Sequence, residues 1–182
     1  AGITPLQFPE SEVELDRAAR SWSRATAVVD PREHFVRRSE YVVLSPFRKG
    51  RTGTQRLGAL IEERLVGRGM SPLAKPILIE QNSRELRVYN GDLAYIHDDQ
   101  APVAVVSAEE GEPRRIAVAR LPRYSAAYAL SIHKSQGSEF DEVLIVLPED
   151  DAPLLTRELL YTAVSRARRS VRIVGPLEVV LG

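Results

Sequence analysis

The chain has 182 residues, of which 43% are hydrophobic and 27% charged, and it contains no cysteine. This composition excludes a disordered polymer, and no apolar run approaches the roughly 18 residues that a membrane-spanning helix needs. Without cysteine there can be no disulfide, thiolate metal site or cysteine nucleophile, and we expect a cytoplasmic protein. The 25 basic and 25 acidic residues cancel, so overall charge does not predict a nucleic-acid partner.

The first third of the chain predicts two helices and a strand between them. Apolar residues recur at helical spacing in both helices, and β-branched residues fill the strand. In chain order we expect a helix over 11–29 that Pro31 ends, a strand over 41–45, a loop with glycine and arginine over 46–53, and a helix over 54–67.

From Pro76 to Pro122 the pattern changes to short β runs with no helix between them. Asn90-Gly91 and Glu110-Gly111 lie in the connections, and such pairs between apolar runs indicate hairpins. The runs cover 76–80, 92–97, 103–107 and 115–120. They predict a small antiparallel barrel or meander inserted into the rest of the fold.

The last third returns to an alternation of strands and helices. We expect a strand over 127–132, a polar loop over 133–141, a buried strand over 143–147, a helix from Thr156 and a strand over 171–174. The order β-α-(insert)-β-β-α-β is typical of an α/β fold with helices packed on a parallel sheet.

Two segments carry the polar residues that indicate chemistry, 129–141 and 160–169. The first is a strand that runs into a polar loop, and ligands of open α/β sheets bind beyond the carboxyl ends of the strands. Gly137 allows close backbone approach to a phosphate, and Glu139 is an acceptor suited to a ribose hydroxyl. Donors suited to a phosphodiester are Ser131, His133, Lys134 and Ser135. In the second segment we expect Arg166 on a helix, between the small residues Ser165 and Ala167, and free to project toward a partner surface.

These two segments resemble a known family. His-Lys-Ser-Gln-Gly-Ser-Glu-Phe at 133–140 resembles motif V of superfamily-1 helicases, and Tyr-Thr-Ala-Val-Ser-Arg-Ala at 161–167 resembles motif VI. Within that superfamily the chain is similar to RecD, the alpha subunit of exodeoxyribonuclease V, and to RecD-like helicases. Residues 44–50, 79–82 with 88–92, and 155–159 support the narrower resemblance.

The resemblance implies a RecA-like second motor domain (2A) formed by residues 1–75 and 124–182. It also implies an SH3-like insertion (2B) over 76–123. The chain has no Gly-x-x-x-x-Gly-Lys-Ser/Thr phosphate loop and no Walker B acidic pair. The family places both in a first motor domain, which holds most of the ATP and Mg²⁺, so the isolated chain is expected to be inactive.

The family also implies a role for individual residues. Arg166 matches the catalytic arginine that reaches the γ-phosphate across the domain cleft. On the nucleotide side the matches are Gly137, Glu139 and Gln136, the last lying between the two sites. The candidates for DNA binding are His133, Ser131, Lys134, Arg48 and Lys49, and no metal site is expected within this chain. Arg168 and Arg169 are better explained as the solvated end of a helix.

The function that the resemblance implies is ATP-dependent 5′-to-3′ unwinding of DNA, in repair and recombination. The expected partners are single-stranded DNA, the first RecA-like domain, and other subunits of a helicase–nuclease complex; a membrane is not among them. The alternative is a non-catalytic module for DNA binding or subunit assembly. A self-contained nucleotide hydrolase or nuclease is disfavoured, because neither a phosphate loop nor a cluster of metal-binding carboxylates is present.

Overall fold

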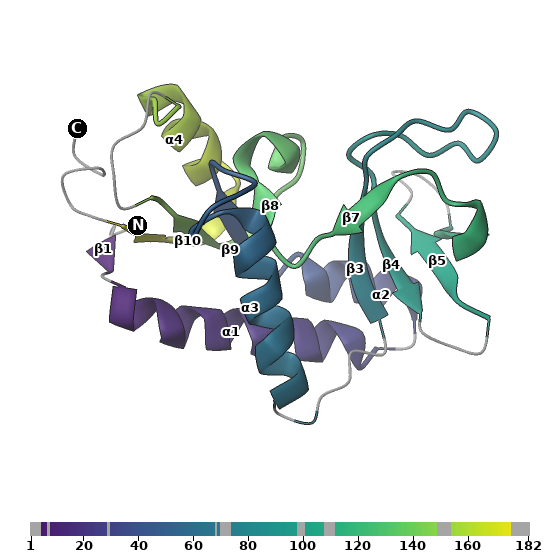
Figure 1. Ribbon diagram of the computed structural model, residues 1–182, viewed down its shortest axis with the longest axis horizontal. Coiled ribbons are helices and arrows are strands. Elements are labelled where there is room, and N and C mark those ends of the chain that lie inside the picture. The colour runs from purple at the N-terminus through teal and green to yellow at the C-terminus, as the bar shows by residue number, and fades with distance from the viewer. Residues whose placement is uncertain are drawn as a thin grey trace.

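The computed structural model describes residues 5–6, 8–28, 30–67, 69, 74–97, 101–107, 112–148 and 154–175. They form two five-stranded sheets that lie next to each other (Figure 1). The first sheet is parallel throughout, as predicted. Its strands are, in spatial order, β1 (Pro5–Leu6), β10 (Ala167–Val174), β9 (Phe140–Val146), β2 (Tyr41–Ser45) and β8 (Leu130–Ser131).

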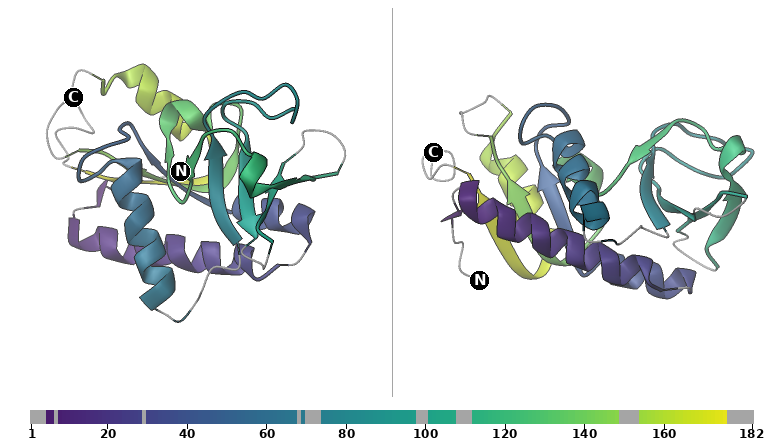
Figure 2. Two further views of the ribbon diagram at one scale, coloured as in Figure 1. Left: turned by 45° about the vertical axis from the view of Figure 1, so that its right-hand side comes forward. Right: turned by 60° about the horizontal axis from the view of Figure 1, so that its bottom comes forward.

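Helices cover both faces of this parallel sheet (Figure 2). On one face lie α1 (Phe8–Thr26) and α3 (Thr54–Gly67), and on the other lie α4 (Arg157–Val164) and the short 3₁₀ helix η2 (Ile132–Ser135). In β9, Leu144 and Val146 face α1 and α3, whereas Val143 and Ile145 face α4. A continuous apolar run therefore supplies both cores, because successive side chains of a strand alternate between its faces. The predicted α/β class, with helices packed on a parallel sheet, is confirmed.

The insert forms the second sheet, which is antiparallel and has its own core. Its spatial order is β6 (Arg114–Ala117), β5 (Val103–Val106), β4 (Leu93–His97), β3 (Ala74–Ile79) and β7 (Tyr124–Ala126), with the 3₁₀ helix η1 (Val118–Arg120) before β7. The first strand of the insert, β3, pairs with its last strand, β7. The chain therefore leaves the parallel sheet and returns to it at neighbouring points. The SH3-like form of this insert and the exact domain boundaries stay predictions.

The prediction for Pro31 was wrong. The first helix already ends at Thr26, and Pro31 begins a further helix, α2 (Pro31–Arg38). Asp30 caps α2 by accepting a hydrogen bond from the Arg32 amide at 2.9 Å, and proline fits the first helical position because the amide it lacks has no partner within the helix. The rings of His34 and Tyr95 on β4 lie 3.8 Å apart, so α2 packs against the insert.

The connection between β3 and β4 also differs from the prediction. Asn90-Gly91 does not close a two-residue hairpin, because the chain makes an excursion over 80–92 that the Ile79 amide closes by donating to Asp92 at 2.9 Å. Glu110-Gly111 lies outside the described residues. The predicted strand over 127–132 is shorter than expected, because only residues 130–131 pair with β2. The residues just before the predicted strand, 124–126, pair in the antiparallel sheet instead. No helix in the described part of the chain is long and apolar enough to cross a bilayer.

Candidate functional site

The loop after β2 holds the predicted DNA-binding residues Arg48 and Lys49, and both side chains are exposed. The loop folds back on the start of α3, where the Thr54 amide donates to the Phe47 carbonyl at 2.9 Å and the Gln55 amide to the Arg48 carbonyl at 3.1 Å. A Cβ at Gly53 would lie 2.4 Å from the Lys49 carbonyl oxygen. Only glycine therefore permits this tight loop, which presents two cations at the carboxyl edge of the sheet.

Residues from both sheets meet in a hollow beside this loop. Its volume is about 100 Å³, and its lining includes Arg48, Ser131 and Lys134. The Arg48 guanidinium pairs at 2.7 Å with Glu80, whose carboxylate is largely buried and also pairs with Arg123 at 3.3 Å. Three of the residues predicted to bind DNA thus come together, and the ion pair with Glu80 offsets part of their positive charge.

The segment after β8 carries the other predicted DNA-binding residues. Ser131 caps η2, its hydroxyl accepting a weak bond from the Lys134 amide, and Ser135 is fully buried with its hydroxyl donating to the Ile132 carbonyl at 2.7 Å. This local bonding orients η2 so that His133 is exposed. The Lys134 ammonium donates to the Asn90 side-chain oxygen of the insert at 2.6 Å.

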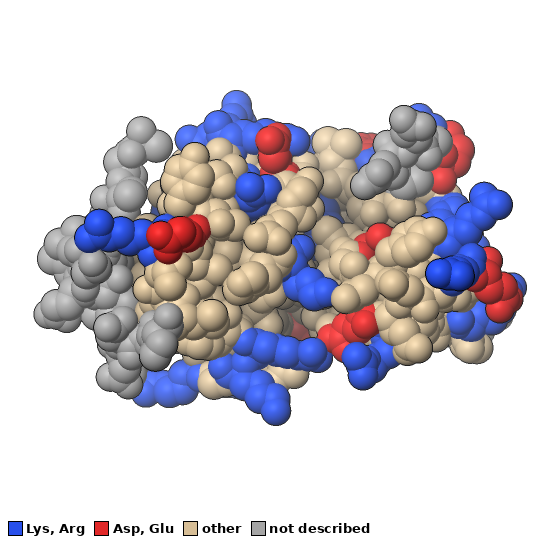
Figure 3. All heavy atoms as spheres, turned by 90° about the horizontal axis from the view of Figure 1, so that it is seen from above, with Lys and Arg blue, Asp and Glu red and all other residues tan. Residues whose placement is uncertain are grey.

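Gly137 makes the predicted bend, with a φ of +82° that favours glycine, and Gln136 next to it is exposed. Both line an open cleft of about 720 Å³ between the η2 segment and the insert. Seen from above in Figure 3, the molecule is hollowed between its two halves, and both basic and acidic side chains lie along the hollow.

Arg166 does not lie on the helix, contrary to the prediction. The helix α4 ends at Val164 and Ser165 caps it, so Arg166 lies in the turn that leads into β10. Its guanidinium donates from Nε to the Thr162 carbonyl at 3.1 Å and from Nη2 to the Ser165 hydroxyl at 3.1 Å. A long third bond of 3.4 Å from Nη1 reaches the Ser138 carbonyl. The side chain is half-buried, at the surface of its own domain.

Arg168 and Arg169 are not a solvated helix end, because both lie on β10. Arg168 pairs at 3.1 Å with the exposed carboxylate of Glu139, and at 3.9 Å with Asp141. Arg169 lies 4.0 Å from Asp141. Sequence reasoning missed the partnership of Arg168 with Glu139, which joins residues 29 positions apart.

The predicted nucleotide and DNA residues lie at opposite edges of the parallel sheet. Ser131 is level with Ser45 at the carboxyl end of β2, whereas Glu142 is level with Tyr41 at its amino end. Phe140 lies two residues before Glu142, so the segment 131–140 runs from the carboxyl end of the strands back to their amino end. The distance corresponds to about six residues of a strand, or roughly 20 Å. Ser131 to Lys134 therefore lie at the carboxyl end of the strands, as predicted, whereas Glu139 precedes β9 and lies near the amino end.

No group of three or more acidic or histidine side chains that could hold a metal occurs among the described residues. Arg48 and Lys134 lie at the carboxyl edge and Arg166 at the amino edge, and arginine and lysine are side chains that pair well with phosphate groups.

Comparison with known proteins assigns the family. The model of the UvrD-like helicase C-terminal domain matches residues 126–174, which contain both edges of the site. The RecBCD enzyme subunit RecD of Mycobacterium tuberculosis is 39% identical over 142 residues, covering 75% of this chain and 25% of that protein. The chain belongs to the RecD-like superfamily-1 helicases.

Two further relatives support the same family. RecD of Mycolicibacterium smegmatis is 35% identical over 170 residues, which are 90% of this chain and 30% of the relative. The ATP-dependent RecD2 DNA helicase of Deinococcus radiodurans is 30% identical over 134 residues, which cover 69% of this chain and 19% of that protein. The chain thus spans less than a third of the length of these RecD-like relatives.

Among solved structures, Pif1 helicase from Bacteroides in complex with ADP-AlF3 and single-stranded DNA has a TM-score of 0.48 at 17% identity, covering 74% of this chain and 40% of that one. Pif1 helicase from Candida albicans has the same TM-score at 13% identity, and the match covers 89% of this chain and 52% of that one.

Proposed function

We propose that this RecD-like chain is the second motor domain of an ATP-dependent 5′-to-3′ DNA helicase. In this proposal Arg166 contacts the γ-phosphate of ATP held by a first RecA-like domain, and Gly137 and Glu139 lie near the ribose. Ser131, His133, Lys134, Arg48 and Lys49 form part of the track for single-stranded DNA. Gln136 lies between the two sites.

The observation that carries the proposal is the environment of Arg166. No carboxylate pairs with it in the part of the chain that the structure describes, whereas its neighbour Arg168 pairs with Glu139. A guanidinium has five N–H donors, and three are used by neutral oxygens, which leaves two and the whole positive charge. Such a group at the surface favours a phosphate brought by a partner.

The two edges are connected through the backbone. The Phe140 amide donates to the Arg166 carbonyl at 2.8 Å, and the Arg166 side chain reaches the Ser138 carbonyl. A pull on Arg166 by the γ-phosphate is therefore transmitted to the segment 131–140, whose other end carries His133 and Lys134. Hydrolysis removes the attraction and the cleft between the motor domains reopens, so that the grip on the DNA backbone alternates.

ATP and Mg²⁺ belong mainly to the first domain in this account. Bound Mg²⁺ neutralises charge on the transferred phosphoryl group, and the described residues offer no carboxylate cluster for it. Because the mycobacterial relatives are named as RecBCD subunits, further subunits of a helicase–nuclease complex are the proposed protein partners.

The second candidate function is a non-catalytic DNA-binding or assembly module. It is favoured by the fact that Arg166 and Glu139 already have partners within their own domain. The two functions differ in whether Arg166 controls ATP turnover.

The test compares the 182-residue chain with a protein that contains both motor domains. We expect no measurable ATP hydrolysis by the chain alone, weak and salt-sensitive binding to a fluorescein-labelled oligothymidylate, and DNA-stimulated hydrolysis when the first domain is present. Saturable hydrolysis by the 182 residues alone would contradict the shared site. As a test of the track, we expect the double substitution Arg48→Glu and Lys49→Glu to weaken oligothymidylate binding and reduce its salt dependence.

A further inference from the structure

The strand β7 lies at one end of the antiparallel sheet, with β3 as its neighbour. Alternate residues make the bonds to β3: the Arg123 carbonyl, just before β7, accepts from the Glu80 amide at 2.8 Å, and the Ala127 amide, just after it, donates to a carbonyl of β3 at 2.9 Å. In an antiparallel pair the residues between such bonds direct their amides and carbonyls away from the partner strand. In β7 these outward residues are Tyr124 and Ala126.

This outer edge of β7 is open. Neither Tyr124 nor Ala126 has another backbone partner in the part of the chain that the structure describes. Together they present two amides and two carbonyls, and such an edge pairs with an extended segment of another chain, which supplies the missing donors and acceptors. The edge is only three residues long, so backbone bonds alone would hold a partner weakly and side-chain contacts must contribute.

An apolar hollow of about 350 Å³ borders the same edge. Both outward residues of β7 line it, together with Ile77, Ile96 and Val118, which belong to the core of the insert or pack against it. Ile96 and Val118 are only partly buried, so the core is open to solvent at this point. An apolar side chain placed in the hollow would therefore be removed from water and would add to that core.

The hollow lies on the opposite face of β3 and β7 from the proposed DNA-binding residues. Ile77 and Tyr124 line it, whereas the next residues along the two strands, Leu78 and Ser125, line the smaller hollow beside Arg48. Successive side chains of a strand point to opposite faces, which accounts for this division. A ligand of the apolar hollow would therefore leave the face with Arg48 accessible to DNA.

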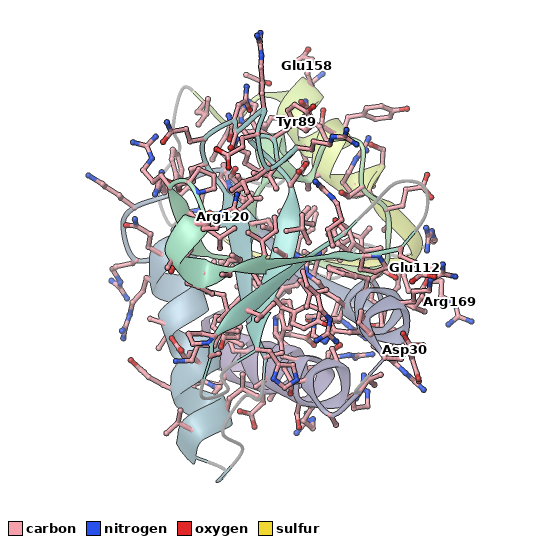
Figure 4. The ribbon with its side chains drawn as sticks, turned by 90° about the vertical axis from the view of Figure 1, so that its right-hand side faces the viewer. Asp30, Tyr89, Glu112, Arg120, Glu158 and Arg169 are labelled. Carbon is pink, nitrogen blue, oxygen red and sulfur yellow. The ribbon has the colours of Figure 1, made fainter. Side chains whose placement is uncertain are left out.

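The rim of the hollow carries two opposite charges. Glu62 belongs to α3 and Lys75 to β3, and neither makes an ion pair in the described part of the chain. Figure 4 shows the insert from its outer side, with Arg120 of η1 labelled on the side where α3 lies. The hollow is thus bounded by α3 and by the insert. An extended segment that lies between them would meet Glu62 with a basic residue and Lys75 with an acidic one.

We propose that the edge of β7 is a docking site for an extended segment of a partner protein, which adds to the insert as a further strand. The segment places alternate apolar side chains in the hollow, between a basic residue that pairs with Glu62 and an acidic residue that pairs with Lys75. The site uses no residue that the proposed function assigns to DNA or ATP, so it allows the partner and DNA to be bound at the same time.

The experiment titrates the ¹⁵N-labelled 182-residue chain with a synthetic peptide of this pattern, Lys-Val-Thr-Val-Thr-Val-Glu, blocked at both ends. We expect saturable binding, with the largest chemical-shift changes at the Tyr124 and Ala126 amides, because each gains an acceptor. Two further peptides carry N-methyl groups on all valines or on all threonines. Alternate amides of a strand point to opposite edges, so one of these peptides should bind about tenfold more weakly and the other like the parent.

Ala126→Pro removes one outward amide and leaves the bonds to β3, because proline is tolerated at a strand edge where its missing N–H faces solvent. We expect affinity for the parent peptide to fall about twofold to tenfold, the loss of one hydrogen bond. Ala117→Pro is the matched control. Ala117 is an exposed alanine on β6, at the other end of the same sheet, and the variant should bind like wild type. Thermal unfolding should show that both variants stay folded.

A charge reversal tests the rim independently of the backbone. Lys75→Glu, at an exposed position, should weaken the parent peptide about twofold to fivefold, as expected for a surface ion pair. A peptide with its terminal glutamate replaced by lysine should regain that affinity with Lys75→Glu and bind wild type more weakly.

Three results would overturn the proposal. They are equal affinities of the two N-methylated peptides, parent affinity in Ala126→Pro equal to wild type, and no binding of the parent at millimolar concentration. Chemical shifts of Tyr124 and Ala126 that change with protein concentration in the absence of peptide, together with a doubled mass in ultracentrifugation, would instead assign the edge to a second copy of this chain and overturn the proposed partner.

Discussion

The backbone amide of Phe140 and the backbone carbonyl of Arg166 are joined by a hydrogen bond of 2.8 Å. Phe140 is fully buried at the start of β9, and Arg166 lies at the surface just before β10. The bond therefore ties the half-exposed arginine to the central strands of the sheet. It also gives a direct path from Arg166 to the segment 131–140, which begins at Ser131 at the opposite edge.

Gly53→Ala should open the loop that presents Arg48 and Lys49. The added Cβ would overlap the Lys49 carbonyl oxygen at 2.4 Å and its carbonyl carbon at 2.5 Å, and backbone atoms cannot yield as a side chain can. We expect a loss of about 1–3 kcal/mol in the free energy of unfolding, measured with urea, and weaker oligothymidylate binding. Gly67→Ala is the control, because no atom lies within 4 Å of its Cβ. A Gly53→Ala variant as stable as wild type would refute this account of the loop.

The stability of the fold should depend on His34 at mildly acidic pH. Burial, opposed in part by the hydrogen bond between Nδ1 and the Ala25 carbonyl, lowers the pKa of His34 from 6.5 to about 4. The unfolded chain binds this proton near pH 6.5 and the folded chain does not, so the stabilisation is present above pH 6.5. It is lost as the pH falls through 6.5 toward 4, and its size is about 3 kcal/mol.

Urea unfolding at a series of pH values from about 7 to about 4 measures this loss. His34→Gln should flatten the pH profile in that window, because the amide does not titrate. His133→Gln, at an exposed position, should keep the profile of wild type. An unchanged slope in His34→Gln would show that other groups cause the acid sensitivity.

Glu139→Ala should affect nucleotide binding and not DNA binding. If this carboxylate contacts the ribose, its removal in a protein with both motor domains should raise the KM for ATP roughly tenfold, as expected for one charged hydrogen bond. Affinity for oligothymidylate should stay within a few-fold of wild type, since Glu139 lies roughly 20 Å from the carboxyl edge. Glu85→Ala is the control, because Glu85 pairs with Arg120 in the insert. Equal effects of both substitutions on KM would argue against a role for Glu139.

Local signals in the sequence predicted the elements well. Thr156 was expected to begin a helix, and its hydroxyl accepts the Leu159 amide bond at 3.2 Å. The apolar run 143–147 was expected to be a buried strand, and it lies in the centre of the parallel sheet. Both depend on neighbours within a few residues, so sequence spacing was sufficient.

Long-range relationships could not be predicted in the same way. Asn90 was interpreted as a turn residue, yet its side chain is bonded to Lys134, 44 positions away. Arg168 was assigned to a helix end, but the helix stops at Val164 and the arginine meets Glu139 across two neighbouring strands. Such contacts depend on the register of the strands, which no local pattern in one sequence contains.

The most direct test of the central claim is the rate of DNA-stimulated ATP hydrolysis by Arg166→Ala in a protein that contains both motor domains. An arginine that reaches the transferred phosphate contributes on the order of 10³–10⁵ in rate, so hydrolysis should fall to background. Single-strand affinity should stay within a few-fold of wild type. Arg169→Ala is the matched control, because Arg169 is an exposed arginine three residues further on, near Asp141, and it should retain turnover.

The account predicts loss of turnover in Arg166→Ala with DNA binding retained, and near-normal turnover in Arg169→Ala. Turnover at the wild-type rate in Arg166→Ala would contradict the claim that this chain completes a shared ATP site.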